Sequence, residues 1–122
     1  MKKVLVVDDE PAIANLAKIK LTNAGFDVAT AHSGEEALER VADEFPDVMV
    51  LDVMMPGMDG WEVASRLKGD PETRHIKILM LTALGVGEQS LPGSVNIDEY
   101  YTKPFEPARL VKLVRKLADK TD

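Results

Sequence analysis

Short apolar runs alternate along this chain with longer stretches in which apolar residues recur at helical spacing. Residues 4–7, 48–51 and 78–81 contain no polar side chain. Strands that are buried on both faces have continuous apolar sequences of this kind, whereas strands with one solvated face alternate. Short buried strands that alternate with amphipathic helices predict βαβ units and a parallel sheet.

The intervening stretches carry helix signals. Pro11 and Pro107 stand where a first helical turn would begin, and Ser33 and Glu36 have the spacing of a capping box. We expect another strand over residues 26–30, and helices after Pro11, after Ser33, over 61–68 and after Pro107. Their predicted buried faces comprise Ile13, Leu16, Ala17 and Leu21, then Leu38, Val41, Ala42 and Phe45, and finally Leu110, Leu113, Val114 and Leu117.

These elements predict one α/β domain over residues 1–122. The expected architecture is a doubly wound, five-stranded parallel sheet in the flavodoxin-like order 2-1-3-4-5, with helices on both faces. The fourth helix is expected to be short or irregular, over residues 86–91 at most. Gly85, Gly87 and Pro92 interrupt this stretch, and a proline disfavours helix at the residue before it.

Composition excludes several classes of protein. The chain has 122 residues, a net charge of −6 and no cysteine. Disulfide frameworks and thiolate metal sites are therefore excluded, and the acidic balance argues against a nucleic-acid partner for this domain. There is no signal-peptide pattern and no apolar run of membrane-spanning length, so we expect a cytoplasmic location and no membrane partner.

Polar residues directly follow the predicted strands. Asp8 and Asp9 follow the first strand, Asp52 the third and Thr82 the fourth, and Lys103 follows the fifth. In an open parallel sheet the carboxyl ends of the strands form the ligand-binding edge, so these side chains should share one site. Three carboxylates in one place repel unless a cation binds them, and all-oxygen ligands favour Mg²⁺, with Mn²⁺ as the alternative ion.

A carboxylate at such a site can act as a nucleophile towards phosphorus. Phosphoryl transfer depends on positioning and on neutralising the charge of the phosphoryl oxygens. A divalent cation, the Lys103 ammonium and the Thr82 hydroxyl would supply that neutralisation.

The motifs together resemble the receiver domain of bacterial two-component response regulators. They are VLVVDDEP at the start, VLDVMMPGMDGWE in the middle, LTA around Thr82 and YYTKPF near the end. The resemblance covers essentially the whole chain.

The resemblance implies roles for the acidic residues and their neighbour. It implies that Asp52 is the phosphoacceptor, and that Asp9, Asp52 and the Met54 carbonyl are direct metal ligands. Asp8 matches the acid that holds the metal through water. The backbone N–H of Met54 is expected to face the phosphoryl oxygens.

The resemblance also implies roles near the fourth and fifth strands. Lys103 matches the phosphate-binding lysine, and its peptide bond to Pro104 is expected to be cis. Thr82 matches the switch hydroxyl, Tyr100 the switch aromatic, and the backbone N–H of Ala83 is expected to face the phosphoryl group.

By this resemblance the chain accepts a phosphoryl group from a sensor histidine kinase or a histidine phosphotransfer protein. The expected output is a changed protein-interaction surface over residues 86–91, the strand at Tyr100 and the helix after Pro107. The chain would catalyse its own phosphorylation without turning over a separate substrate. Met54 and Leu84 carry no group that orients water, so autodephosphorylation is expected to be slow.

Three alternatives stay open at this point. One is a Mg²⁺-dependent aspartyl phosphotransferase or phosphohydrolase acting on a small substrate, and another is a degenerate receiver used as a scaffold. A flavodoxin-like FMN module is the third, although Asp8, Asp9 and Glu10 would repel its phosphate. We interpret His32 and His75 as surface loop residues. The downstream target, and whether the domain stands alone, do not follow from the sequence.

Overall fold

The computed structural model describes residues 1–82, 97–102 and 106–120, with the side chains of Thr82 and Thr102 outside that description. The predicted fourth helix over residues 86–91 lies outside the described residues. The described elements are β1 (Lys3–Val7), α1 (Pro11–Asn23), β2 (Asp27–Ala31), α2 (Gly34–Glu44), β3 (Val48–Asp52), α3 (Gly60–Lys68), β4 (Lys77–Thr82), β5 (Glu99–Thr102) and α4 (Pro107–Ala118).

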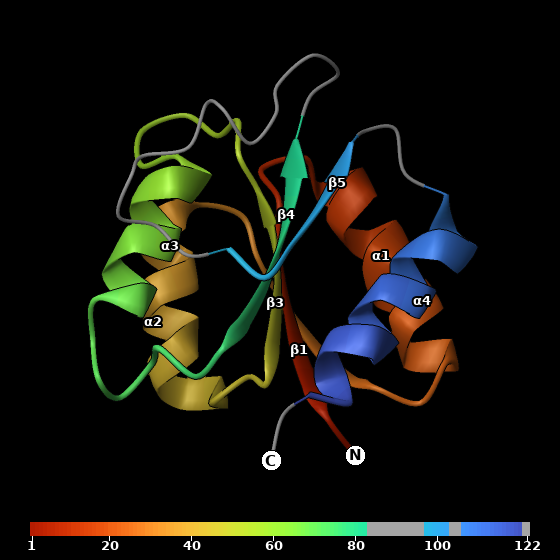
Figure 1. The fold of residues 1–122 in the computed structure, drawn as a ribbon. Coiled ribbons are helices and arrows are strands. Elements are labelled where there is room, and N and C mark those ends of the chain that lie inside the picture. Colours follow the sequence, from red (N-terminus) through yellow and green to blue (C-terminus); the bar gives the residue numbers. More distant parts are fainter. Residues whose placement is uncertain (83–96, 103–105, 121–122) are drawn as a thin grey trace.

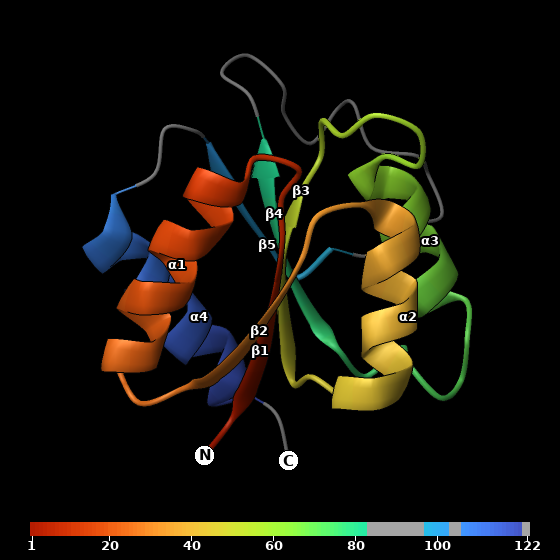
Figure 2. The ribbon, with the colours of Figure 1, turned by 180° about the vertical axis from the view of Figure 1, so that it is seen from behind.

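The five strands form one parallel sheet in the order β2-β1-β3-β4-β5. This confirms the predicted flavodoxin-like topology. Helices α1 and α4 cover one face of the sheet, and α2 and α3 cover the other (Figures 1 and 2). All strands run in the same direction, so their carboxyl ends meet at the upper edge of the sheet in Figure 1.

Successive side chains of the central strands supply two separate cores. Leu5, Met49 and Ile78 belong to the core beneath α2 and α3. Their chain neighbours Val4 and Val48 belong to the core beneath α1 and α4. Neighbouring residues of a strand lie on opposite faces of the sheet. Because helices cover both faces, every position needs an apolar residue, which explains the continuous apolar runs.

The predicted buried faces of α1 and α2 are partly wrong, whereas that of α4 is largely confirmed. In α1 the buried residues are Ala14, Ala17 and Leu21, while Leu16 is 40% exposed. In α2 they are Gly34, Ala37 and Val41. Both helices contact the sheet through small residues as well as through the predicted Leu21 and Val41, and Leu38 packs against the core while partly exposed. In α4, Leu110, Val114 and Leu117 are buried as predicted.

Phe45 is a clear departure from prediction, since its side chain is 79% exposed. It caps the end of α2 in the left-handed conformation, with φ 48° and ψ 59°. Pro46 accounts for the end of the helix, because a residue before proline is disfavoured in the right-handed helical region. The helix therefore ends here, and the ring leaves the buried face.

Ion pairs of Asp98 and Glu99 anchor the start of the edge strand β5. The Lys68 ammonium donates to Asp98 Oδ2 at 3.1 Å and to the carbonyls of Ile76 and Arg74 at 2.7 and 3.2 Å. Asp98 Oδ2 also accepts from the Ile78 N–H at 2.8 Å. At the next residue, Glu99 pairs with Lys116 of α4 at 2.8 Å. The strand is thus fixed to helices on both faces of the sheet.

The Lys68–Asp98 and Lys116–Glu99 pairs should contribute differently to the free energy of unfolding, because only the first is largely shielded from water. The Lys68 side chain is 13% exposed. Lys68→Met leaves Asp98 with only the longer ion pair to Lys77, at 3.9 Å, and removes the donor to two carbonyls. It should lower the free energy of unfolding by about 2 kcal/mol. Lys116→Met removes an exposed pair and should cost less than about 1 kcal/mol. Urea denaturation of the two variants measures the difference, and equal costs would contradict this account.

The loss of stability in Lys116→Met should depend on pH. The hydrogen bond from Lys116 lowers the pKa of Glu99 below its ordinary value of 4.5. A lowered folded-state pKa gives stability that is present above 4.5 and is lost as the pH falls through the folded-state pKa. The difference between wild type and Lys116→Met should therefore be complete at about pH 7 and absent near about pH 2.

Candidate functional site

Asp52 is the last residue of β3, the strand that lies between β1 and β4. All five residues of β3 are buried, and Asp52 is 2% exposed. It is in register with Leu81 of β4, and the Val53 N–H next to it donates to the Leu81 carbonyl at 3.1 Å. The sheet thus holds a carboxylate at its centre with little access to water.

Asp8 and Asp9 follow β1, which is the neighbour of β3. The Asp8 N–H donates to the Ala31 carbonyl at 3.1 Å, which extends the contact between β1 and β2 by one residue. Asp8 Oδ1 accepts from the Glu10 N–H at 2.9 Å, and the side chain is 1% exposed. Asp9 is half-buried.

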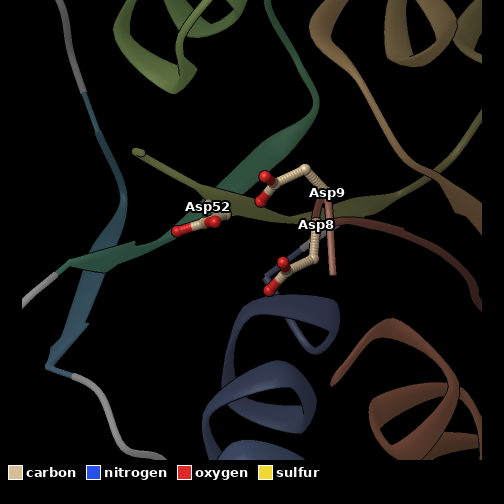
Figure 3. A group of neighbouring side chains, drawn as sticks. All are labelled: Asp8, Asp9 and Asp52. Carbon is tan, nitrogen blue, oxygen red and sulfur yellow. The ribbon is translucent and has the colours of Figure 1, made fainter. Parts of the chain in front are cut away.

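The three carboxyl groups lie around one small space (Figure 3). One oxygen from each of Asp8, Asp9 and Asp52 lies within 4.8 Å of the other two. Two ionised carboxylates at this distance repel by roughly 3 kcal/mol at an effective dielectric constant of about 20. A divalent cation relieves this repulsion, and an all-carboxylate set without His or Cys suits Mg²⁺ or Mn²⁺.

The loop after Asp52 is fixed by two glycines that the sequence analysis did not single out. A Cβ on Gly60 would meet the Asp52 carbonyl oxygen and, at 2.9 Å, Val53 Cα. A Cβ on Gly34 would meet the Met58 carbonyl oxygen at 2.8 Å. Both glycines begin helices, where many residue types are acceptable, so their identity was the only sequence signal for these close contacts.

The remaining predicted site residues lie near β4 and β5. Tyr100 pairs in register with Met80, and its ring centroid lies 6.4 Å from that of Trp61 on α3. Met54 is exposed and lines a hollow beside Asp52's strand end together with Trp61. The Thr82 side chain, Ala83, Lys103 and Pro104 lie outside the described residues.

Comparison with known protein families identifies the family of this chain. Residues 4–115 match the response regulator receiver domain family. The chain belongs to this family. It is 40% identical to the "DNA-binding dual master transcriptional regulator RpaA" of Synechocystis sp., over 123 residues that cover 100% of the chain and 51% of RpaA. This receiver domain therefore spans about half the length of that relative.

Solved structures agree with the receiver fold. The receiver domain of the Francisella response regulator 1452 has a TM-score of 0.88 and 34% identity, and the match covers 100% of both chains. Chemotaxis protein CheY4 of Vibrio cholerae has a TM-score of 0.87 and 32% identity, with coverage of 96% of this chain and 98% of that one. The predicted resemblance is confirmed.

Receiver domains are signalling domains that are phosphorylated by histidine kinases and bind Mg²⁺ through acidic residues. The Asp cluster of this receiver domain offers the residue types and the spacing that such an ion requires. In the described part of the chain, no helix is long and apolar enough to cross a membrane.

Gly60→Ala should disturb this receiver domain, because the new methyl group meets the backbone of Asp52 and Val53. Overpacking of this kind costs about 1–3 kcal/mol. The matched control is Gly69→Ala at the other end of α3, where a Cβ meets only the carbonyls of its own helix. Thermal unfolding and Mg²⁺ titration of both variants test this, and a Gly60→Ala variant as stable as Gly69→Ala would contradict it.

Proposed function

We propose that Asp52 accepts a phosphoryl group from a histidine kinase or a histidine phosphotransfer protein in a Mg²⁺-dependent reaction. One observation carries the proposal: in a receiver domain, the Asp52 carboxylate is buried at the centre of the sheet edge, with carboxylate oxygens of Asp8 and Asp9 within 4.8 Å. A carboxylate oxygen attacks phosphorus, the P–N bond of the phosphohistidine breaks, and the imidazole leaves and takes up a proton. The product is an aspartyl phosphate.

The acidic residues divide the work of binding the ion. Asp9, Asp52 and the Met54 carbonyl are proposed as direct ligands, and Asp8 as a ligand through water. When bound, Mg²⁺ supplies positive charge that offsets the charge of the phosphoryl oxygens. The hydrogen bond from the Glu10 N–H holds Asp8 in place for this role.

The residues that follow β4 and β5 are proposed to complete the site. Lys103 would contact the phosphoryl oxygens, together with the backbone N–H groups of Met54 and Ala83. The Lys103–Pro104 peptide bond is proposed to be cis. Support comes from the strand order, because β4 and β5 end at the sheet edge that carries Asp52.

The switch is proposed to run from Thr82 to Tyr100. A phosphoryl group on Asp52 would draw the Thr82 hydroxyl inward through a charge-assisted hydrogen bond, and Tyr100 would then turn inward. Tyr100 belongs to a short edge strand and is half-buried beside Trp61 of α3, so a change of its position would alter the surface at this edge of the sheet.

We further propose that residues 1–122 form one receiver domain without a separate turnover substrate. Its downstream target is proposed to be a protein. The cytoplasmic location and the slow autodephosphorylation stay predictions.

Intact mass measured after incubation with Mg²⁺ and acetyl phosphate tests the proposal. The wild type should gain one phosphoryl group, and Asp52→Asn or added EDTA should abolish the gain. Asp47→Asn is a matched control, because Asp47 directly precedes the other end of β3 and its Oδ2 accepts from the Lys3 N–H.

Three results would contradict the proposal. An adduct that persists in Asp52→Asn would place the chemistry elsewhere. A folded wild type that binds Mg²⁺ but accepts no phosphoryl group, even from phosphorylated kinase, would favour a scaffold. Steady release of phosphate from small phosphomonoesters would favour the hydrolase alternative.

A further inference from the structure

His32 contacts the acid cluster through the backbone of Asp8. It lies directly after β2, and its Nδ1 is 3.1 Å from the Asp8 carbonyl oxygen. A carbonyl oxygen carries no proton, so the hydrogen of this bond must reside on Nδ1. The contact therefore requires the Nδ1–H form of the ring or the imidazolium.

The accepting carbonyl belongs to the peptide group that joins Asp8 to Asp9. A peptide group is planar, so an anchor on its oxygen also orients the Asp9 N–H and fixes the position of Asp9 Cα. Strand β1 ends at Val7, and the Asp8 N–H is bonded to Ala31. In a longer parallel ladder the next donor to Asp8 would be a backbone N–H of β2. The His32 imidazole takes that place.

The backbone of His32 is itself held by the start of α2. Its N–H donates to Glu36 Oε1 at 2.8 Å, and the Glu36 N–H donates to the capping Ser33 Oγ at 3.0 Å. The Ser33 half of the predicted capping box is confirmed, whereas the Glu36 side chain accepts from the His32 N–H instead of the Ser33 N–H. The imidazole consequently extends from a fixed base.

We propose that His32 is a positioning residue for the acid cluster. It acts on the Asp8–Asp9 peptide group and keeps the two adjacent carboxylates directed towards Asp52 against their mutual repulsion. Without this bond the peptide group can rotate, and the Asp9 carboxylate can turn outward to water. The inference rests on the proposed function in so far as the cluster holds Mg²⁺.

Three substitutions separate the hydrogen bond from the bulk of the ring. Asn places an amide N–H close to the position of Nδ1, Gln places it about one bond further out, and Leu has no donor. The His32 side chain is exposed, so each substitution fits without steric conflict. His32→Leu and His32→Gln should weaken Mg²⁺ binding in calorimetric titration by about tenfold, and His32→Asn by less than about threefold. The unfolding temperatures of all three variants should be close to that of the wild type.

Nuclear magnetic resonance without any metal provides a second, independent measurement. His32 should carry a proton on Nδ1. The Asp9 amide resonance should shift in His32→Leu and return towards the wild-type position in His32→Asn.

The outcomes separate this proposal from the proposed function. A proton on Nε2, equal Mg²⁺ affinity in all variants, or a His32→Asn variant as weak as His32→Leu would overturn the role of His32. If the wild type binds no Mg²⁺, the metal site fails, and the His32 proton and the Asp9 amide resonance still decide whether the imidazole orients that peptide group.

Discussion

Mutual repulsion among three carboxylates is the cost that this architecture must offset. Asp8 and Asp52 are almost fully buried, and Asp9 brings a third oxygen within 4.8 Å of theirs. Left to themselves, flexible acidic side chains would separate and turn to water. The parallel sheet prevents this at Asp52, because β3 is paired on both sides and buried along its length. Rigid neighbours thus keep the three carboxylates together in an arrangement that could hold a divalent cation.

The same constraint explains why much of the site could be predicted from the sequence. Continuous apolar runs predict a parallel sheet, and a parallel sheet gathers the residues that follow its strands. Asp8, Asp9 and Asp52 are therefore brought together by strand order alone, and the structure confirms this. The roles of Thr82 and Lys103 stay predictions, since the relevant atoms lie outside the described residues.

Other features could not be predicted, because they depend on contacts between residues distant in the chain. The periodicity of α1 favours a buried Leu16, but Ala14 is buried instead, beside the predicted Ala17 and Leu21. Phe45 fits the apolar stripe of α2 and yet leaves it, because Pro46 determines the local backbone. His32 looks like an ordinary loop residue until its contact with the Asp8 carbonyl is seen. Short-range patterns do not encode such contacts.

The glycines around the loop after Asp52 have a consequence for how this chain can change during evolution. Surface loops usually tolerate insertions and deletions, because their ends need only remain within reach of each other. Residues 53–59 are different. The Gly60 N–H bonds to the Val53 carbonyl at 3.0 Å, and Met58 rests against Gly34 of another helix. Adding or removing one residue would break one of these attachments, so the length of this loop is fixed even where its side chains are free to vary.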